Sequence, residues 1–310
     1  MSAWPIERDA AYLARLAAAV EQAYGLVATA IVPAKRGFYA ETWRLETADG
    51  RYFLKLMYPG PRQATYRASF AVMAGLAARG VDFIPGIRPT VDARLYAWFD
   101  GAVLGVFEWL DGDNVESDAT KPAEFALLAR LYSLDPAGLA LPREDFGTAA
   151  ASRFLARWRG LGDAVLTGWL EPYLGQFDRL ADRLATCAER CQGDDSGFHL
   201  THGDAGGNLI GRGGRYWLVD WDNPLLAPPE RDAWVMAGQD WARAEFSAAL
   251  RRVGLDYVLR PERLAYYCYH SFFFYLAEYL DSGRRDAAGL ELLGYTNGWF
   301  EQRLRYADSL

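Results

Sequence analysis

The stretch that decides the fold is LTHGDAGGNLI, residues 200–210. It is followed by a strand-forming segment with a glycine pair, residues 213–214, at its centre, and this pattern favours a β-hairpin. The loop that enters the first strand carries Asp204 and Asn208, and the second strand ends at Asp220. We therefore expect the oxygen atoms of these three side chains to converge at one end of one hairpin.

This set of side chains indicates phosphoryl transfer. The oxygens of Asn208 and Asp220 suit a hard divalent cation such as Mg²⁺, which also binds phosphate oxygens and water. Asp204 remains available to receive a proton from a substrate hydroxyl. Metal ligands, an orienting carboxylate and a nucleophile supplied by the substrate are the parts that phosphoryl transfer requires.

The chain before this hairpin predicts an antiparallel sheet with a helix between its strands. Apolar residues at helical spacing up to Tyr24 predict a first helix, which Gly25 ends. A second, small-residue helix is expected over residues 62–79. Segments rich in β-forming residues predict the strands, with a hairpin turn at Asp100-Gly101. The expected strands are residues 27–32, 40–47, 51–57, 94–99 and 102–110.

After residue 110 the pattern becomes helical, and the glycine-pair hairpin is the one strand-forming island that we identify there. The chain thus divides into a small sheet-rich lobe and a larger helical lobe, and a ligand site between lobes is common. The expected helices cover residues 121–134, 149–159, 171–191, 230–252, 261–281 and 285–306.

The composition excludes several classes of protein. The chain has 310 residues, of which 51% are hydrophobic and 24% charged, so it is not a disordered protein. No apolar run reaches the roughly 18 residues of a membrane helix. A net charge of −7 without a block of Lys or Arg argues against nucleic acid as the main partner and suits a cationic small molecule. Three cysteines and the lack of a secretion signal favour a cytoplasmic protein.

The residues around the hairpin resemble a known enzyme family. His202-Gly203-Asp204 with Asn208, followed by Val219-Asp220-Trp221, are similar to motifs of the aminoglycoside phosphotransferase family, and residues 222–232 look most like its spectinomycin phosphotransferase branch. The resemblance implies an α+β, two-lobed protein-kinase-like fold with a small antiparallel-sheet N-lobe and a larger helical C-lobe. It implies three parts: a nucleotide-binding lobe, a hinge, and a helical lobe with the catalytic loop and substrate pocket. They would span residues 1–107, 108–112 and 113–310.

The resemblance also implies roles for single residues. Asp204 would be the catalytic carboxylate that holds the acceptor hydroxyl and takes its proton. Asn208 and Asp220 would hold Mg²⁺, while His202 and Asp232 would support the catalytic loop. The family usually places five steps between this Asp and this Asn, whereas here there are four. The two glycines between them can adopt backbone angles that let the loop contract.

On the nucleotide side, Lys55 lies in an apolar strand and resembles the family's strand lysine that contacts the α- and β-phosphates of ATP. Gly37 lies in a segment placed like the loop that covers the nucleotide phosphates. Glu108 and Leu110 lie in a segment that resembles the hinge strand, whose backbone groups meet adenine. The resemblance therefore implies ATP as the second cofactor beside Mg²⁺.

A second feature, after the shortened loop, departs from the kinase pattern. In that pattern a glutamate on the helix after the lysine strand orients the lysine. The expected helix over residues 62–79 contains no Asp or Glu. Either a partner from elsewhere holds Lys55, with Glu41 as a candidate, or packing holds it.

The resemblance implies an acceptor pocket that is built by the C-terminal helices. The highly aromatic residues 266–275 are mostly core by their pattern, although some rings could line a pocket. Asp222, Asp240 and Glu278 are candidate partners for an ammonium group of the substrate, because carboxylates and aromatic rings both bind such cations.

The sequence thus predicts an ATP- and Mg²⁺-dependent O-phosphotransferase that acts on a hydroxyl of a small cationic molecule, with an aminoglycoside or aminocyclitol antibiotic as the leading acceptor. One alternative is a metabolite kinase of the choline, homoserine or sugar type. Another is a catalytically weak, kinase-like nucleotide-binding protein, which the short loop and the acid-free helix motivate. We expect a monomer or homodimer that binds neither nucleic acid nor a membrane.

Overall fold

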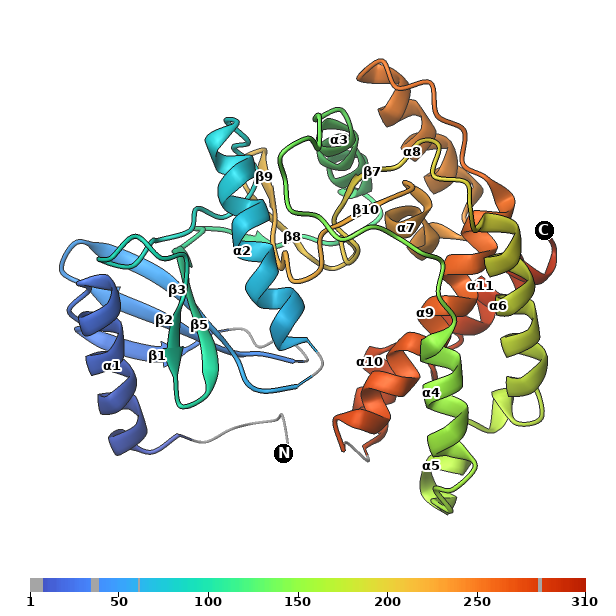
Figure 1. Cartoon of the computed structure of the whole chain (residues 1–310), viewed down its shortest axis with the longest axis horizontal. Coiled ribbons are helices and arrows are strands. Elements are labelled where there is room, and N and C mark those ends of the chain that lie inside the picture. Colours follow the sequence, from blue (N-terminus) through green and yellow to red (C-terminus); the bar gives the residue numbers. More distant parts are fainter. Residues whose placement is uncertain (1–7, 35–38, 61, 284–285) are drawn as a thin grey trace.

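The computed structural model describes residues 8–34, 39–60, 62–283 and 286–310. The N-terminal part is an antiparallel sheet with two helices, and the C-terminal part is mainly helical (Figure 1). The predicted α+β arrangement, with a sheet-rich lobe followed by a larger helical lobe, is therefore confirmed.

The N-lobe is built on a five-stranded sheet with strand order β1-β2-β3-β5-β4, in which every neighbouring pair is antiparallel. A two-residue turn joins β4 to β5, and both of its residues, Asp100 and Gly101, have positive φ angles of 47° and 78°. These angles match the twist of the strands, as the sequence predicted. The strands are β1 (Ala30–Pro33), β2 (Glu41–Thr47), β3 (Gly50–Met57), β4 (Ala97–Phe99) and β5 (Ala102–Glu108).

The two faces of this sheet are covered by different helices. Helix α1 (Ala10–Tyr24) packs on one face, where it buries Leu54 and Leu56 of β3. Helix α2 (Gln63–Ala78) lies over the opposite face. Since side chains alternate along a strand, Lys55 points to the side of α2. The alternation of β3 therefore directs its lysine towards the C-lobe.

The C-lobe is organised around the long helix α9 (Pro261–Asp281), which packs against α4, α6 and α11. No helix in the described part of the chain is long and apolar enough to cross a membrane. The other C-lobe helices are α3 (Lys121–Tyr132), α4 (Ala149–Trp158), α5 (Ala164–Trp169), η1 (Glu171–Tyr173), α6 (Phe177–Cys191), α7 (Glu230–Ala233), η2 (Trp234–Met236), α8 (Asp240–Arg252), α10 (Ala287–Leu292) and α11 (Trp299–Asp308).

The predicted hairpin is present in the C-lobe. Strands β8 (Leu209–Arg212) and β9 (Arg215–Leu218) pair antiparallel around Gly213 and Gly214, whose φ angles are 57° and 82°. Only residues that tolerate positive φ suit such a turn, which explains the glycine pair. The short strand β6 (Asp113–Asn114) extends this sheet. A separate pair, β7 (His199–Thr201) with β10 (Leu225–Ala227), was not predicted.

Three predicted helices are wrong in their length. The segments 171–191, 230–252 and 285–306 each break into shorter helices. Each break contains a glycine with positive φ, an angle that ends an α-helix. These glycines are Gly175, Gly238, Gly294 and Gly298, with φ angles of 75°, 85°, 88° and 79°. Helix α5 was also not predicted.

Candidate active site

The loop between β7 and β8 carries Asp204 and Asn208. Its conformation requires glycine at position 203, where φ is 84°. A Cβ atom there would lie 2.3 Å from the guanidinium of Arg231, which itself donates to the Thr201 hydroxyl at 2.9 Å. Arg231 was not singled out from the sequence, because its role depends on this close approach to the loop backbone.

Asp232 fixes the start of this loop. Its carboxylate accepts hydrogen bonds from the backbone N–H groups of His202, at 3.0 Å, and Gly203, and from the hydroxyl of Tyr132 at 2.9 Å. Asp232 is buried, with 2% of its surface exposed, so these three bonds replace the water that burial removes. This geometry agrees with a supporting role for Asp232.

His202 braces the other side of the loop. The backbone N–H of Asp204 donates to its Nδ1 at 3.3 Å, so that Nε2 carries the proton and donates to the carbonyl of Val219 at 3.0 Å. Burial lowers the pKa of His202, which keeps the ring neutral. A neutral, doubly hydrogen-bonded imidazole holds the loop beside the end of β9 and has no free nitrogen to act as a base.

Asp204 has a very different environment from Asp232. It keeps a solvent-exposed side, although protein surrounds it closely, and its carboxylate has one long hydrogen bond, from the hydroxyl of Tyr275 at 3.4 Å. Desolvation and the nearby Asp220 carboxylate raise the pKa of Asp204 to about 7, against the opposing effect of Arg62. A carboxylate with few partners and a pKa near neutrality is suited to general base chemistry.

The shortened loop still brings Asn208 to Asp204. The side-chain amide of Asn208 donates to the backbone carbonyl of Asp204 at 2.7 Å. Gly207 has a φ of 90°, which lets the loop turn within four residues. Because the amide nitrogen is used in this way, the amide oxygen of Asn208 is the atom left for another ligand.

Lys55 of the N-lobe meets two aspartates of the C-lobe. Its ammonium group forms ion pairs with Asp220 and with Asp222, the latter at 2.5 Å. Asp220 follows β9 with a φ of 68°, a strained angle for a residue other than glycine, and such strain clusters at functional sites. These ion pairs therefore join the two lobes at the place where the sequence predicts the residues that bind the metal and the phosphates.

The charges in this group depend on one another. Burial alone would lower the pKa of Lys55, but Asp220 and Asp222 raise it above its ordinary value. Burial would raise the pKa of Asp220, but the Lys55 ammonium lowers it. Burial and the Asp220 carboxylate raise the pKa of Asp222, and Lys55 opposes this effect. Asp220 is thus held as a carboxylate.

The suggestion that Glu41 holds Lys55 is wrong. Lys55 pairs with Thr42 across β2 and β3, so the neighbouring Glu41 lies on the opposite face of the sheet. There its carboxylate accepts hydrogen bonds from Arg8 at 2.6 Å, Tyr12 at 2.7 Å and Trp43 at 2.8 Å. Glu41 therefore belongs to the interface between the sheet and α1.

A second ion pair joins the lobes next to Asp204. Arg62 donates to the buried carboxylate of Glu278 at 2.8 Å, and its guanidinium lies 3.7 Å from the ring centre of Tyr39. Glu278 also binds Arg153 at 3.2 Å. Arg62 was missed by the sequence reasoning, although a cation at the N-cap of a helix, where Ser, Thr, Asp or Asn is preferred, is a signal of a tertiary partner.

Asp240, another residue that was predicted from the sequence, is not placed next to Lys55 and the aspartates around it. Asp240 begins α8 with its side chain 94% exposed and pairs with Arg243 of the same helix. It is separated from the loop because the expected long helix 230–252 breaks at Gly238. Gly37 lies outside the described residues.

The hinge begins at Glu108, the last residue of β5. The backbone N–H of Glu108 donates to the carbonyl of Gly86 at 2.8 Å, and the carbonyl of Leu110 accepts from Gly112 at 3.1 Å. The groups that remain candidates for contacting adenine are therefore the carbonyl of Glu108 and the N–H of Leu110.

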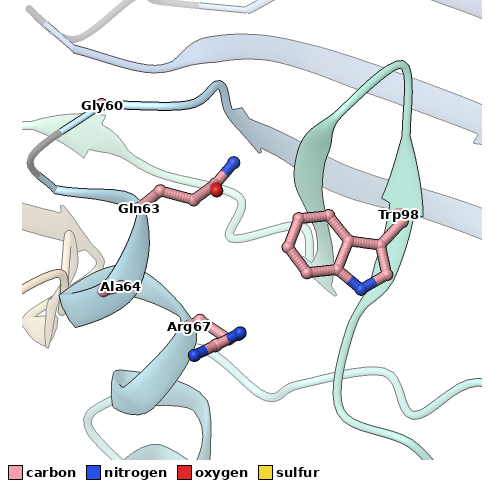
Figure 2. Close-up of a pocket in the computed structure, with 5 residues that line it drawn as sticks. All are labelled: Gly60, Gln63, Ala64, Arg67 and Trp98. Carbon is pink, nitrogen blue, oxygen red and sulfur yellow. The ribbon is translucent and has the colours of Figure 1, made fainter.

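A pocket of about 200 Å³ lies elsewhere, between the start of α2 and β4. Figure 2 shows Gln63 and Arg67 of α2 on one side and the indole of Trp98 on the other. Gln63 is already engaged, since its amide donates to the carbonyls of Met57 and Gly101 at 2.9 Å. None of the chemistry-bearing residues of the loop lines this pocket, so it is separate from the candidate active site.

The donor set at the hairpin fits Mg²⁺ in its chemistry, because Asn208 and Asp220 offer oxygen atoms alone. Within the described residues there is no group of three or more His, Cys, Asp or Glu side chains that could hold a metal ion by themselves. A cation here would depend on an amide oxygen and on phosphate oxygens to complete its ligands, as is usual for Mg²⁺ at nucleotide sites.

Comparison with known proteins agrees with the geometry of the site in indicating a phosphotransferase. The model of the phosphotransferase enzyme family matches residues 30–267. A search of the curated protein sequences finds no significant match.

Three solved structures illustrate the shared fold. A spectinomycin phosphotransferase in complex with ADP and spectinomycin has a TM-score of 0.75 at 17% identity, over 99% of this chain and 100% of that one. A macrolide 2′-phosphotransferase type I has a TM-score of 0.62 at 16% sequence identity, and the match covers 92% of this chain and 96% of that one. A microcompartment-associated aminopropanol kinase has a TM-score of 0.63 at 16% sequence identity, and the match covers 90% of this chain and 93% of that one.

The resemblance inferred from the hairpin motifs is thereby confirmed. The family model covers well over half of the chain, and the solved structures share its fold over nearly the full length of both chains. The chain belongs to the phosphotransferase enzyme family and has the two-lobed, kinase-like fold of the aminoglycoside phosphotransferases.

Proposed function

We propose that this enzyme transfers the γ-phosphoryl group of ATP to a hydroxyl of a small cationic molecule, with an aminocyclitol or aminoglycoside antibiotic as the leading acceptor. The observation that carries the proposal is the meeting of Lys55 from the N-lobe with Asp220 from the C-lobe, beside Asp204 on the loop of the same hairpin. Phosphate-binding cation, metal-binding carboxylate and general base are the groups this reaction needs.

Asp204 would carry the chemistry on the acceptor side. Its carboxylate would orient the acceptor hydroxyl and take its proton as the oxygen attacks the γ-phosphorus. The new O–P bond forms while the bond from the γ-phosphorus to the β–γ bridging oxygen breaks, and ADP leaves. The hydroxyl of Tyr275 at 3.4 Å and the bracing by His202 would hold the Asp204 side chain in place.

Lys55, Asn208 and Asp220 would serve the nucleotide. Lys55 would neutralise phosphate charge, and the oxygens of Asn208 and Asp220 would hold Mg²⁺. When bound, Mg²⁺ would neutralise charge on the phosphate oxygens. The hinge 108–112 would contact adenine through the Glu108 carbonyl and the Leu110 N–H, with the nucleotide-binding lobe (1–107) on one side and the helical lobe (113–310) on the other.

A cationic acceptor is supported by the carboxylates near Asp204. Glu278 is 6% exposed and already binds two arginines, Arg62 and Arg153, and the guanidinium of Arg62 lies 5.1 Å from the ring centre of Phe274 in the same helix as Glu278. An ammonium group of a substrate would find the same kind of partner there. A kinase of an amino alcohol is the second candidate, because the aminopropanol kinase shares the fold.

Two measurements test the proposal in order. The protein should gain thermal stability with ATP in a manner that depends on Mg²⁺, because a ligand that binds the folded state stabilises it. ADP release should then be measured with a panel of aminocyclitols, aminoglycosides, amino alcohols and homoserine. If one class of compound raises the rate of ADP release above the rate with water alone, that class contains the acceptor. If no compound of the panel raises this rate, the result favours a nucleotide-binding protein with little catalytic activity.

A further inference from the structure

The lysine strand lacks the helix partner that a kinase normally provides. None of the residues of α2 is an Asp or Glu. In its place α2 presents Tyr66, whose ring centre lies 5.3 Å from the Lys55 ammonium and whose hydroxyl donates to the Lys55 carbonyl at 3.2 Å. The helix therefore contacts Lys55 through an aromatic side chain that cannot form an ion pair with it.

The packing of α2 leaves no room for another side chain at this place. Gly105 of β5 lies opposite Lys55, and a Cβ atom on it would be 2.6 Å from the Tyr66 hydroxyl and 2.5 Å from Phe70. Tyr66 is itself buried, with 1% of its surface exposed. A carboxylate for Lys55 thus has to come from outside the N-lobe helix.

The C-lobe supplies two carboxylates that differ in exposure. The side chain of Asp222 is 14% exposed and that of Asp220 is 35% exposed, while Lys55 is 8% exposed. The backbone N–H of Asp222 donates to the carbonyl of Asp220 at 2.9 Å, a turn that keeps the two residues together. The more open Asp220 is available to a cation, whereas the more enclosed Asp222 remains next to the lysine.

We propose that Asp222 is the positioning residue for Lys55 and replaces the helix glutamate of the kinase pattern. The inference rests on the proposed function. When Asp220 engages the cation, Asp222 keeps the Lys55 ammonium directed at the phosphates. Because Asp222 belongs to the C-lobe, the lysine is aligned only while the two lobes are together, so its alignment depends on lobe apposition and not on the position of α2.

A double-mutant cycle with Lys55→Met and Asp222→Asn tests this role. The readout is ADP affinity measured by calorimetry without Mg²⁺, with adenosine as the phosphate-free control. We expect Asp222→Asn to weaken ADP binding about tenfold and to leave adenosine binding unchanged. In the Lys55→Met background the same substitution should have no further effect, because Asp222 acts through Lys55. Asp240→Asn, an exposed aspartate, serves as the matched control.

Several outcomes would overturn the inference. Additive effects in the cycle would show that Asp222 acts independently of Lys55. An unchanged ADP affinity together with a higher Mg²⁺ requirement would assign Asp222 to the metal, and a change confined to the KM of the acceptor would assign it to the substrate. A wild-type protein that binds no ADP would instead overturn the proposed function itself.

A second variant covers the case in which Asp222→Asn does not fold. Asp222→Glu keeps the charge but moves the carboxylate by one methylene group, which displaces Lys55. It should weaken ADP binding while adenosine binding stays unchanged. An unchanged affinity for both ligands in this variant would contradict the positioning role.

Discussion

Two groups of buried charge lie on opposite faces of the same N-lobe sheet, and they differ in how fully their partners satisfy them. On the α1 face, Glu41 is 3% exposed and accepts hydrogen bonds from Arg8, Tyr12 and Trp43. On the other face, Lys55 faces Asp220 and Asp222, with Asp204 close by. The first group joins a helix to a sheet, whereas the second joins the two lobes.

The difference teaches how a structural carboxylate is distinguished from one available for chemistry. Glu41 has three donors, so its charge is satisfied within the fold. Asp204 has one hydrogen bond, at 3.4 Å, and its pKa is raised to about 7. Asp220 has a strained backbone angle and shares one lysine with Asp222. Unmet bonding capacity, a raised pKa and backbone strain occur together on the interlobe face.

The largest effect is expected from Asp204→Asn. Loss of the general base should lower the turnover number about 10²–10⁴-fold while ATP affinity stays close to that of the wild type. The check is ADP release at saturating acceptor, with ATP binding measured in parallel. A variant that retains full turnover would place the base elsewhere.

The same substitution also has a predicted effect on stability. The folded protein raises the pKa of Asp204 from 3.8 to about 7, so it binds this proton more tightly than the unfolded chain does. The contribution of Asp204 to stability is therefore fully present below pH 3.8 and is lost as the pH rises through 7. Asp204→Asn should raise the Tm relative to wild type more at pH 8 than at pH 5, as measured by calorimetry.

The pH dependence of kcat/KM in the wild-type enzyme should also report the ionisation of Asp204. In the free enzyme kcat/KM for the acceptor should fall about tenfold per pH unit below pH 7, because only the ionised carboxylate accepts the proton. The residual activity of Asp204→Asn should lack this acidic limb. An identical limb in both proteins would assign it to a different group.

Glu41→Gln should affect stability and leave catalysis unchanged. The amide keeps the shape but cannot accept from Arg8, Tyr12 and Trp43 as the carboxylate does, so the free energy of unfolding should fall by about 1–3 kcal/mol. The turnover number at 25 °C should stay within a factor of about two of the wild type. Denaturant unfolding and ADP release on one preparation provide the check.

Asp240→Asn is the smallest expected change. The side chain is 94% exposed and has an ion pair with Arg243 within its own helix, so stability should change by less than about 0.5 kcal/mol. The KM for the acceptor should not change either. A clear increase in this KM would restore Asp240 as a substrate residue.

The local patterns in the sequence predicted the elements that place the site. The β-forming residues of 51–57 predicted the strand of Lys55, and the glycine pair of residues 213–214 predicted the hairpin that ends at Asp220. Both rest on interactions between close neighbours along the chain. The breaks at Gly175, Gly238 and Gly294 were not predicted, because glycine adopts a helical angle as readily as a positive one and only the surrounding packing selects between them.

The sequence by itself determined the fold, the hairpin and the identity of the residues around Asp204, since each follows from periodicity, turn chemistry or a short motif. The tertiary structure alone decided which acid faces Lys55 and that Arg62 binds Glu278. These partners are 165 or more residues apart, and each contact joins one lobe to the other. Such a choice depends on which faces the two lobes turn towards each other, and no local pattern in either segment carries that information.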